Sequence, residues 1–302
     1  MKNVFLALAL CISFSGFAQV FNVTSVEKVG IPVNPNAKVA AISPQGDYIL
    51  LTSSSNKGLT KFDLATQKAT SLSNSEGAGY DVKISHDGQN VIYRETSFSS
   101  NHFRSTALAS QNLASGKKEV LVAPTRDLQG VAVQGASAVI VNKGKLSTKA
   151  FNDSPIQAAS PMLSIQNRQL MISRNGKTKT FSPNGNSCSY LWPSVSPDGS
   201  KALYYVGGVG AYVCNIDGTN VKLLGKIRAP KWYDDNTVIG MNDVDNGEFI
   251  YASTIVAVTL DGKSQSLTDG STIAMYPEVS PATGKIAFST PAGEAYIMNV
   301  TK

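Results

Sequence analysis

The side chains best suited to chemistry in this 302-residue chain are aromatic and basic rather than catalytic. Phe98, His102, Phe103 and Arg104 stand together within residues 94–106, a long polar segment. Aromatic rings and guanidinium groups give a recognition surface a large contact area with few rotatable bonds. This segment is therefore a candidate binding surface, with the alternative that its two phenylalanines only pack on a neighbouring part of the chain.

A second long segment, residues 242–249, carries Asp243, Asp245 and Glu248. Carboxylates at alternate positions of a loop are typical of calcium sites. The standard calcium loop, however, has glycine at position six, whereas Gly247 is the fifth residue counted from Asp243. We favour an acidic hairpin loop and expect no metal site; weak calcium binding by the three carboxylates is the alternative.

Nucleophilic catalysis has little support in the sequence. The only histidines are His86 and His102, so neither a zinc site nor a Ser-His-Asp triad has enough partners. No Gly-x-Ser-x-Gly motif occurs, and the glycine-rich residues 207–210 join two expected strands rather than opening a phosphate-binding helix. We expect no cofactor. An enzyme with Arg, Tyr, Asp or Glu around a channel would leave no local motif, so this class stays open.

Short turns recur along the chain and organise these segments. Residues 43–46 (Ser-Pro-Gln-Gly) and 196–199 (Ser-Pro-Asp-Gly) each precede an alternating apolar run, and residues 85–88 and 280–284 are variants. Proline presets the φ of a turn, aspartate bonds to nearby backbone, and glycine takes a positive φ. Each copy therefore predicts a hairpin of two short strands.

Further strands are expected after these hairpins. Third strands are predicted at residues 60–64, 211–216, 255–260 and 295–300, and fourth strands at 68–72, 118–122, 221–224 and 264–267. Many evenly spaced short strands without a long helical pattern predict an all-β protein. Units of four antiparallel strands are typical of a β-propeller, in which closure of the ring protects the sheet edges.

The repeat resembles that of the TolB-type propeller family, related to the WD-repeat propellers. The shared pattern is proline, two residues, Ser-Pro-Asp-Gly, then lysine and an apolar strand. It is good at residues 193–206 and 277–289, partial at 41–52 and 83–93, and faint between 125 and 185. The resemblance implies a propeller, and it implies a role like that of family members that act as protein-binding parts of cell-envelope complexes.

The faint middle decides the number of blades. Two contracted hairpins are expected there, at residues 131–141 and 162–173, followed by strands at 146–151 and 177–181. Counted separately they give seven blades, which we favour; merged they give six, the usual number in the TolB family. The last visible strand is the third of its blade, so residues 20–26 are expected to return as the fourth and join the two ends of the chain.

Propeller topology predicts on which face of the ring each candidate residue lies. Loops between second and third strands and the crossovers between blades open on one face, around the mouth of the central channel. The predicted ligand- or partner-binding residues on this face are Phe98, His102, Phe103, Arg104, Tyr80, Arg126, Tyr190, Arg228 and Tyr276. For Trp192, Trp232 and Tyr276, which lie next to the repeat prolines, we favour packing between blades, with contact to a partner as the alternative.

The N-terminus predicts export. Lys2, an apolar run at residues 4–14 and small residues before Gln19 form a secretory signal peptide (residues 1–18), expected to be cleaved after Ala18. The run is shorter than the roughly 20 residues that a membrane-spanning helix needs, and no later stretch is apolar enough. The net charge of +6 includes no block of like charges, so no nucleic-acid partner is expected. For Cys188 and Cys214, both a disulfide and two separate thiols stay open.

Together these observations predict one β-propeller domain, residues 19–302, exported to the periplasm or the cell exterior and monomeric. We expect it to be non-enzymatic and to bind an envelope protein or an extracellular polymer. The alternative is a propeller lyase or hydrolase that acts on a polysaccharide or peptide at the channel mouth. A third hypothesis is a purely structural part of a cell-surface assembly.

Overall fold

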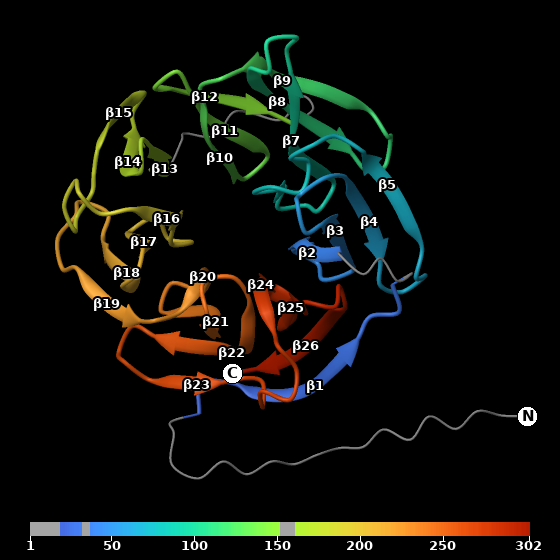
Figure 1. The fold of residues 1–302 in the computed structure, drawn as a ribbon, viewed down its shortest axis with the longest axis vertical. Coiled ribbons are helices and arrows are strands. Elements are labelled where there is room, and N and C mark those ends of the chain that lie inside the picture. Colours follow the sequence, from blue (N-terminus) through green and yellow to red (C-terminus); the bar gives the residue numbers. More distant parts are fainter. Residues whose placement is uncertain (1–18, 32–36, 152–160) are drawn as a thin grey trace, which may run out of the picture.

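Seven small antiparallel sheets stand around a common axis (Figure 1). The computed structural model describes residues 19–31, 37–151 and 161–302. It confirms the all-β propeller and seven blades rather than six. The expected signal peptide lies outside the described residues. Within the described part of the chain, no helix is long and apolar enough to span a membrane.

Five blades have four strands. Blade 1 consists of β2 (Ala37–Ile42), β3 (Tyr48–Ser53), β4 (Leu59–Asp63) and β5 (Ala69–Ser73). Blade 2 consists of β6 (Lys83–Ile84), β7 (Asn90–Phe98), β8 (Arg104–Asn112) and β9 (Lys118–Thr125). Blade 5 consists of β16 (Tyr190–Val195), β17 (Lys201–Val206), β18 (Gly210–Asn215) and β19 (Lys222–Gly225). Blade 6 consists of β20 (Arg228–Asp234), β21 (Thr237–Asp245), β22 (Ile250–Thr259) and β23 (Ser264–Ser266). Blade 7 consists of β24 (Met275–Ser280), β25 (Lys285–Ser289), β26 (Ala295–Thr301) and β1 (Asn22–Lys28).

The two remaining blades have three strands within the described residues, in the region where the repeat is faint. Blade 3 consists of β10 (Leu128–Gln134), β11 (Ser137–Asn142) and β12 (Lys145–Ala150). Blade 4 consists of β13 (Met162–Gln166), β14 (Gln169–Arg174) and β15 (Lys177–Thr180). The contracted hairpins predicted from the sequence are therefore separate blades.

Each predicted Ser-Pro turn is held by a buried serine hydroxyl. In blade 5, the Ser196 hydroxyl donates to Asp198 Oδ1 (2.5 Å) and accepts the N–H of Lys201 (2.9 Å). Gly199 has a φ of 74°, which a residue with a Cβ rarely adopts. In blade 1, the Ser43 hydroxyl donates to Asp47 Oδ1 (2.5 Å) and accepts the N–H of Tyr48 (3.2 Å). The hydroxyl satisfies backbone donors where the ladder ends, so these few residues determine the turn.

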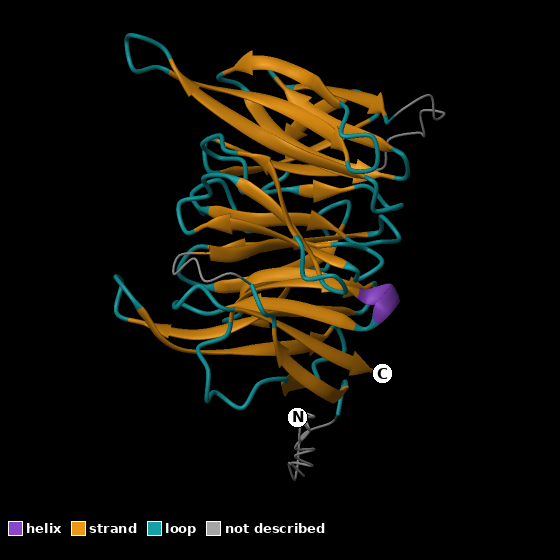
Figure 2. Cartoon of the chain, turned by 90° about the vertical axis from the view of Figure 1, so that its right-hand side faces the viewer, coloured by secondary structure: helices purple, strands orange, loops and turns teal. Residues whose placement is uncertain are grey.

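The same turns also join neighbouring blades. The Tyr48 hydroxyl of blade 1 donates to Gly88 O in blade 2 (2.8 Å). The Ser280 hydroxyl of blade 7 donates to Pro44 O in blade 1 (2.8 Å). The single helical turn, η1 (Pro281–Thr283), lies on this side of the ring in Figure 2. This face of the molecule is therefore cross-linked from blade to blade by hydrogen bonds.

The ring closes as predicted, through the N-terminal strand. β1 is the outermost strand of blade 7 and pairs antiparallel with β26, from Asn22 with Thr301 to Lys28 with Tyr296. Just before β1, Phe21 is 1% exposed and packs in the core shared by blades 6 and 7. The two ends of the chain thus complete one sheet.

The two cysteines of the described chain are free thiols in the structure. Cys214 is 2% exposed and packs in the core between blades 4 and 5, whereas Cys188 is half-buried in the segment before β16. The sequence left both arrangements open, and separate thiols are the one observed.

Candidate functional site

Two hairpins project from the face opposite the helical turn (Figure 2). They are β7–β8 of blade 2 and β21–β22 of blade 6, at the upper and lower ends of the molecule in Figure 1. Both connect a second to a third strand, so the two long segments lie on one face, as the topology predicts. We call this the mouth face; it comprises these hairpins, the other turns between second and third strands, and the crossovers between blades.

The two segments are extended strands rather than the loops expected from the sequence. In blade 2, the ladder continues through Thr96 with Thr106 and Ser97 with Ser105 to Phe98 with Arg104, which leaves a turn at residues 99–103. In blade 6, β21 and β22 pair as far as Asp245. The segments are polar because both faces of a projecting hairpin meet solvent. A polar composition is also typical of loops, so it does not distinguish a loop from a projecting hairpin.

Aromatic side chains stand exposed at the tip of the first hairpin. Phe98 is 60% exposed and Phe103 is 55% exposed. The Arg126 guanidinium, from the crossover between blades 2 and 3, lies 4.9 Å from the centre of the Phe103 ring. His102 occupies the turn with a φ of 59°, and Arg104 is exposed beside it. Five of the predicted binding residues thus gather here.

The second hairpin carries an apolar tip that the sequence reasoning missed. Phe249 is 64% exposed, Tyr251 is 59% exposed and Val244 is 50% exposed. The signal was present, because residues 249–251 place two aromatics at alternate positions of an otherwise polar stretch. Alternation in a strand puts such residues on one face. The acidic residues of the same segment masked that pattern.

The acidic residues of this hairpin face a cation of the protein itself. Arg228 Nη1 lies 2.6 Å from Asp243 Oδ2 and 3.0 Å from Asp245 Oδ2. The Asp243 side chain is 2% exposed, so its carboxylate is shielded from solvent, whereas the Arg228 side chain is 30% exposed. Two of the three carboxylates of the calcium alternative are therefore engaged by Arg228. No group of three or more His, Cys, Asp or Glu suited to a metal ion occurs among the described residues.

Charged side chains also converge on the axis of the ring. Lys231 of β20 and Glu278 of β24 form an ion pair of 2.6 Å, and Arg94 lies 3.1 Å from Asp81 in blade 2. Lys38 Nζ of β2 lies 5.8 Å from the centre of the Tyr276 ring. Although they lie on or next to innermost strands, the Lys231 and Asp81 side chains keep 37% and 36% exposure. Water therefore reaches the axis.

Three cations act on the ionisation of Asp81. Burial alone would raise the pKa of Asp81, but the positive charges of Lys83, Arg94 and Lys231 outweigh burial and lower the pKa. Lys231 belongs to blade 6 and Asp81 precedes the first strand of blade 2, so their interaction spans the axis. The signal in the sequence was a charged residue directly after the repeat proline, as in Pro230-Lys231 and Pro277-Glu278.

Several innermost strands begin with a bulge next to these charges. Trp192, Ala229 and Tyr276 have φ values of 46°, 47° and 53°, and the ladder shifts register at each of them. Non-glycine residues in this region cost about 1–3 kcal/mol each, and such strain gathers at functional sites. The bulges re-aim the inner strands at the mouth face.

The remaining predicted residues divide between surface and core. Tyr80 is 56% exposed on the mouth face, and the Arg94 guanidinium lies 5.2 Å from its ring centre. Tyr190 is placed differently from our expectation, because it is 1% exposed and its hydroxyl donates to Gly185 O (3.0 Å). It organises the segment before β16 rather than offering a surface. Trp192 is half-buried and packs edge-on against Tyr205, with ring centres 5.3 Å apart.

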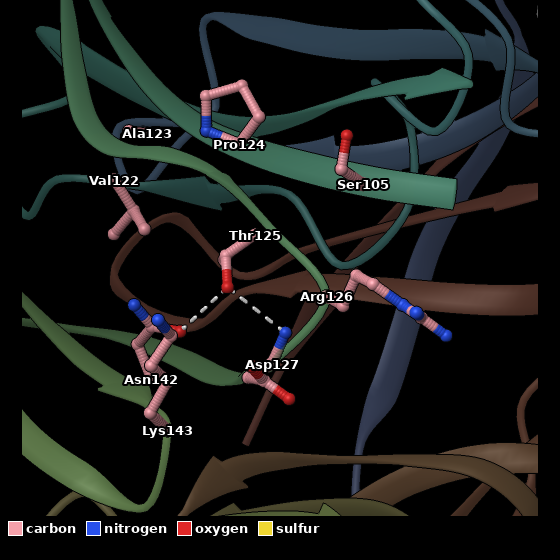
Figure 3. Close-up of a pocket in the computed structure, with 9 residues that line it drawn as sticks. All are labelled: Ser105, Val122, Ala123, Pro124, Thr125, Arg126, Asp127, Asn142 and Lys143. Carbon is pink, nitrogen blue, oxygen red and sulfur yellow. Dashed lines mark hydrogen bonds between the residues drawn. The ribbon is translucent and has the colours of Figure 1, made fainter. Parts of the chain in front are cut away.

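A pocket of about 420 Å³ lies beside the first hairpin (Figure 3). Its lining comes from the end of β9, the crossover to β10 and the turn after β11, and includes Arg126 and Lys143. Inside it, the Thr125 hydroxyl donates to Asn142 Oδ1 (3.5 Å) and accepts the N–H of Asp127 (3.2 Å). The pocket thus has a polar floor, with the cations of Arg126 and Lys143 and the carboxylate of Asp127 in its lining.

Solved propellers share this architecture. The chain superimposes on a structure of the mitotic checkpoint complex with a TM-score of 0.60 and 11% identity, covering 100% of this chain and 99% of that one. A catalytically inactive virginiamycin B lyase from Staphylococcus aureus with quinupristin gives 0.61 and 12%, covering 92% and 99%. A putative TolB from Agrobacterium tumefaciens gives 0.53 and 15%, covering 89% and 92%.

Identities this low show a common fold and no more. At that level the resemblance to TolB-type and WD-repeat propellers is confirmed. A scan of protein-family models finds no match for the chain, and a search of curated proteins finds none.

Proposed function

We propose that this protein is an exported, non-enzymatic binding module of the cell envelope, which recognises a protein partner with its mouth face. One observation carries the proposal: the exposed large hydrophobic side chains of the described residues gather on that face. The eight on this face are Tyr80, Phe98, Phe103, Leu191, Val209, Val244, Phe249 and Tyr251. The remaining exposed large hydrophobic residues, which lie on or next to the outer strands β1, β9 and β19, are Val26, Val120, Val221 and Leu223.

The arrangement of these side chains fits protein recognition. The two projecting hairpins stand at opposite ends of the ring (Figure 2), each carries exposed aromatic side chains, and the Arg126 guanidinium lies over the Phe103 ring of one of them. Aromatic and arginine anchors dominate the binding energy of protein interfaces. Exposed apolar patches of this kind on a folded protein mark interaction sites.

The state of the carboxylates on this face also favours a binding role over general acid catalysis. Asp81 has a lowered pKa, so it stays ionised at neutral pH, whereas a general acid needs a raised pKa. Asp243 and Glu278 are each within ion-pair distance of a cation. The alternative, a lyase or hydrolase at the channel mouth, is supported by the fact that enzymes such as virginiamycin B lyase and acylaminoacyl peptidase share the fold.

The test is a capture experiment with residues 19–302 from an envelope extract of the source cells. Three proteins are compared: the unaltered chain, a hairpin variant (Phe98→Ala, Phe103→Ala, Arg126→Ala), and a wall variant (Val120→Ala, Val221→Ala, Leu223→Ala). A partner retained by the unaltered chain and the wall variant but lost by the hairpin variant supports the proposal, once the purified pair binds with the same pattern. Equal capture by all three, or turnover of a glycan or peptide panel, overturns it.

A further inference from the structure

Basic residues are distributed unevenly along the chain. Residues 126–180 contain eight Lys and Arg but only two Asp, a net charge of +6 that equals the net charge of the whole chain. The rest of the protein is electrically balanced. Blades 3 and 4, which these residues build, therefore carry the entire charge excess.

These cations are also unpaired. We call them the basic sector: Arg126, Lys143, Lys145, Lys149, Arg168, Arg174, Lys177 and Lys179. All eight are exposed, and none forms an ion pair within the described residues. Elsewhere in the described chain, eleven of the eighteen Lys and Arg do so. The sector is thus the one large region of the described chain whose positive charge is not neutralised by the protein.

The cations follow the outer wall of the ring. β12 and β15 are the outermost described strands of blades 3 and 4, and they contact each other (Figure 1). On β12, the exposed Lys145 and Lys149 alternate with half-buried residues, so they share one face of the strand. Lys177 and Lys179 do the same on β15. The wall therefore presents a row of ammonium groups.

The row continues to the mouth face. Arg126 and Lys143 border the 420 Å³ pocket next to the first hairpin (Figure 3). An anionic group that leaves the wall at this end would meet Arg126, Lys143 and the polar floor around Thr125, beside the single carboxylate of Asp127. The sector thus connects a convex wall with a place where a small acidic group can be held.

Protection of sheet edges explains the presence of only some of the cations in the basic sector. Lysines on edge strands prevent pairing with another sheet, and this accounts for the four lysines within β12 and β15. It does not account for Arg126 in a crossover, Arg168 in a turn, or Arg174 at the end of β14. Those side chains add positive charge where no edge needs protection.

The surroundings of the cations indicate the kind of ligand. Among the described residues of this segment, no large hydrophobic side chain is exposed. The sector therefore offers no apolar wedge for a bilayer and no ring on which nucleic-acid bases could stack. A convex wall of dispersed charges suits a linear, flexible polyanion. We propose that blades 3 and 4 bind an anionic polysaccharide along the outer wall, at a site distinct from the aromatic tips of the two projecting hairpins.

Two variants of equal charge test this proposal. The sector variant replaces Lys145, Lys149 and Lys177 with Gln, and the control variant replaces Lys68, Lys117 and Lys226 with Gln. All six lysines are exposed and unpaired in the described structure, so each variant loses three charges without losing an ion pair. Binding to heparin and to alginate is measured by titration at low ionic strength, with anionic phospholipid vesicles as a third probe.

We expect the dissociation constant for both polysaccharides to rise at least about tenfold in the sector variant and less than about twofold in the control. The physical reason is that a lysine which meets the polyanion displaces a bound counterion, and glutamine does not. A variant that carries only Phe98→Ala and Phe103→Ala, and therefore keeps Arg126, should bind the polysaccharides like the unaltered chain, which separates this site from the aromatic tip of the proposed partner site. Equal weakening in both lysine variants would show only nonspecific attraction and overturn the proposal. Tighter binding to vesicles than to either polysaccharide would overturn it in favour of a membrane.

Discussion

Closure of the ring depends on Phe21, so its replacement by alanine should weaken the whole propeller. The Phe21 ring is 1% exposed and meets Tyr233 edge-on, with ring centres 4.6 Å apart. The Gln265 side chain accepts the N–H groups of Val20 (2.7 Å) and Phe21 (2.8 Å) and donates to Phe21 O (2.8 Å). One ring and one amide thus attach the N-terminal strand of blade 7 to blade 6.

The size of the effect follows from these contacts. Replacing a buried phenylalanine with alanine costs about 3–5 kcal/mol, because transfer energy is lost and a cavity forms. For residues 19–302, an unfolding entropy of about 2.1 cal/mol/K per residue makes a loss of about 4 kcal/mol correspond to a fall in Tm of about 7 °C. Because β1 pairs only with β26, hydrogen exchange should quicken first in these two strands and in β23.

The assay is thermal unfolding followed by circular dichroism, together with hydrogen exchange resolved by mass spectrometry. Phe98→Ala is the matched control, because the same side chain is removed where it is 60% exposed. A surface change of this kind should alter stability by less than about 0.5 kcal/mol. Equal melting temperatures for the two variants would refute the reasoning that the N-terminal strand closes the ring.

Two further predictions concern groups in the interior. Burial raises the pKa of Cys214 from 9.0 to about 11, so the folded state keeps a proton that the unfolded state loses. The free energy of unfolding should therefore fall by about 2–3 kcal/mol as pH rises from about 9 to 11. Urea titrations at a series of pH values should show a smaller fall in Cys214→Ala. An unchanged slope in that variant would exclude Cys214 as the cause. A Cβ on Gly79 would overlap the buried Thr52 side chain, so Gly79→Ala should lower stability by about 1–3 kcal/mol, while Gly207→Ala, whose Cβ would lie 3.4 Å from Ser189 Cβ, should not. Similar melting curves for the two alanine variants would contradict this account.

The fold could be predicted because its determinants are local. Ser196, Pro197, Asp198 and Gly199 specify a turn through bonds that span at most five residues, and in blade 1 the Ser43 hydroxyl likewise accepts the N–H five residues on, that of Tyr48. The return of the N-terminal strand was predictable from strand counting, because a lone third strand leaves an open edge. Both inferences needed only the order of short elements along the chain.

The site was predicted less well because its contacts are distant in sequence. Arg228 meets Asp243 only after β20 and β21 have paired, and Lys231 reaches Asp81 only after the ring has closed. Tyr190 appeared to be a surface aromatic, since nothing in residues 181–189 shows that this segment wraps around its hydroxyl. Such interactions follow from the assembled ring, which the local patterns do not encode.

The cross-linked face and the projecting hairpins have different consequences for how this protein can change. The turns at Pro44 and Gly88 bond across blades, so a substitution there disturbs two sheets at once. Within the described chain, the hydrogen bonds of residues 97–105 stay inside their own hairpin. Descendants of this protein can therefore exchange or lengthen the hairpin tips, and with them the choice of partner, while inheriting the ring intact. The same separation makes the tips suitable places to graft foreign recognition segments.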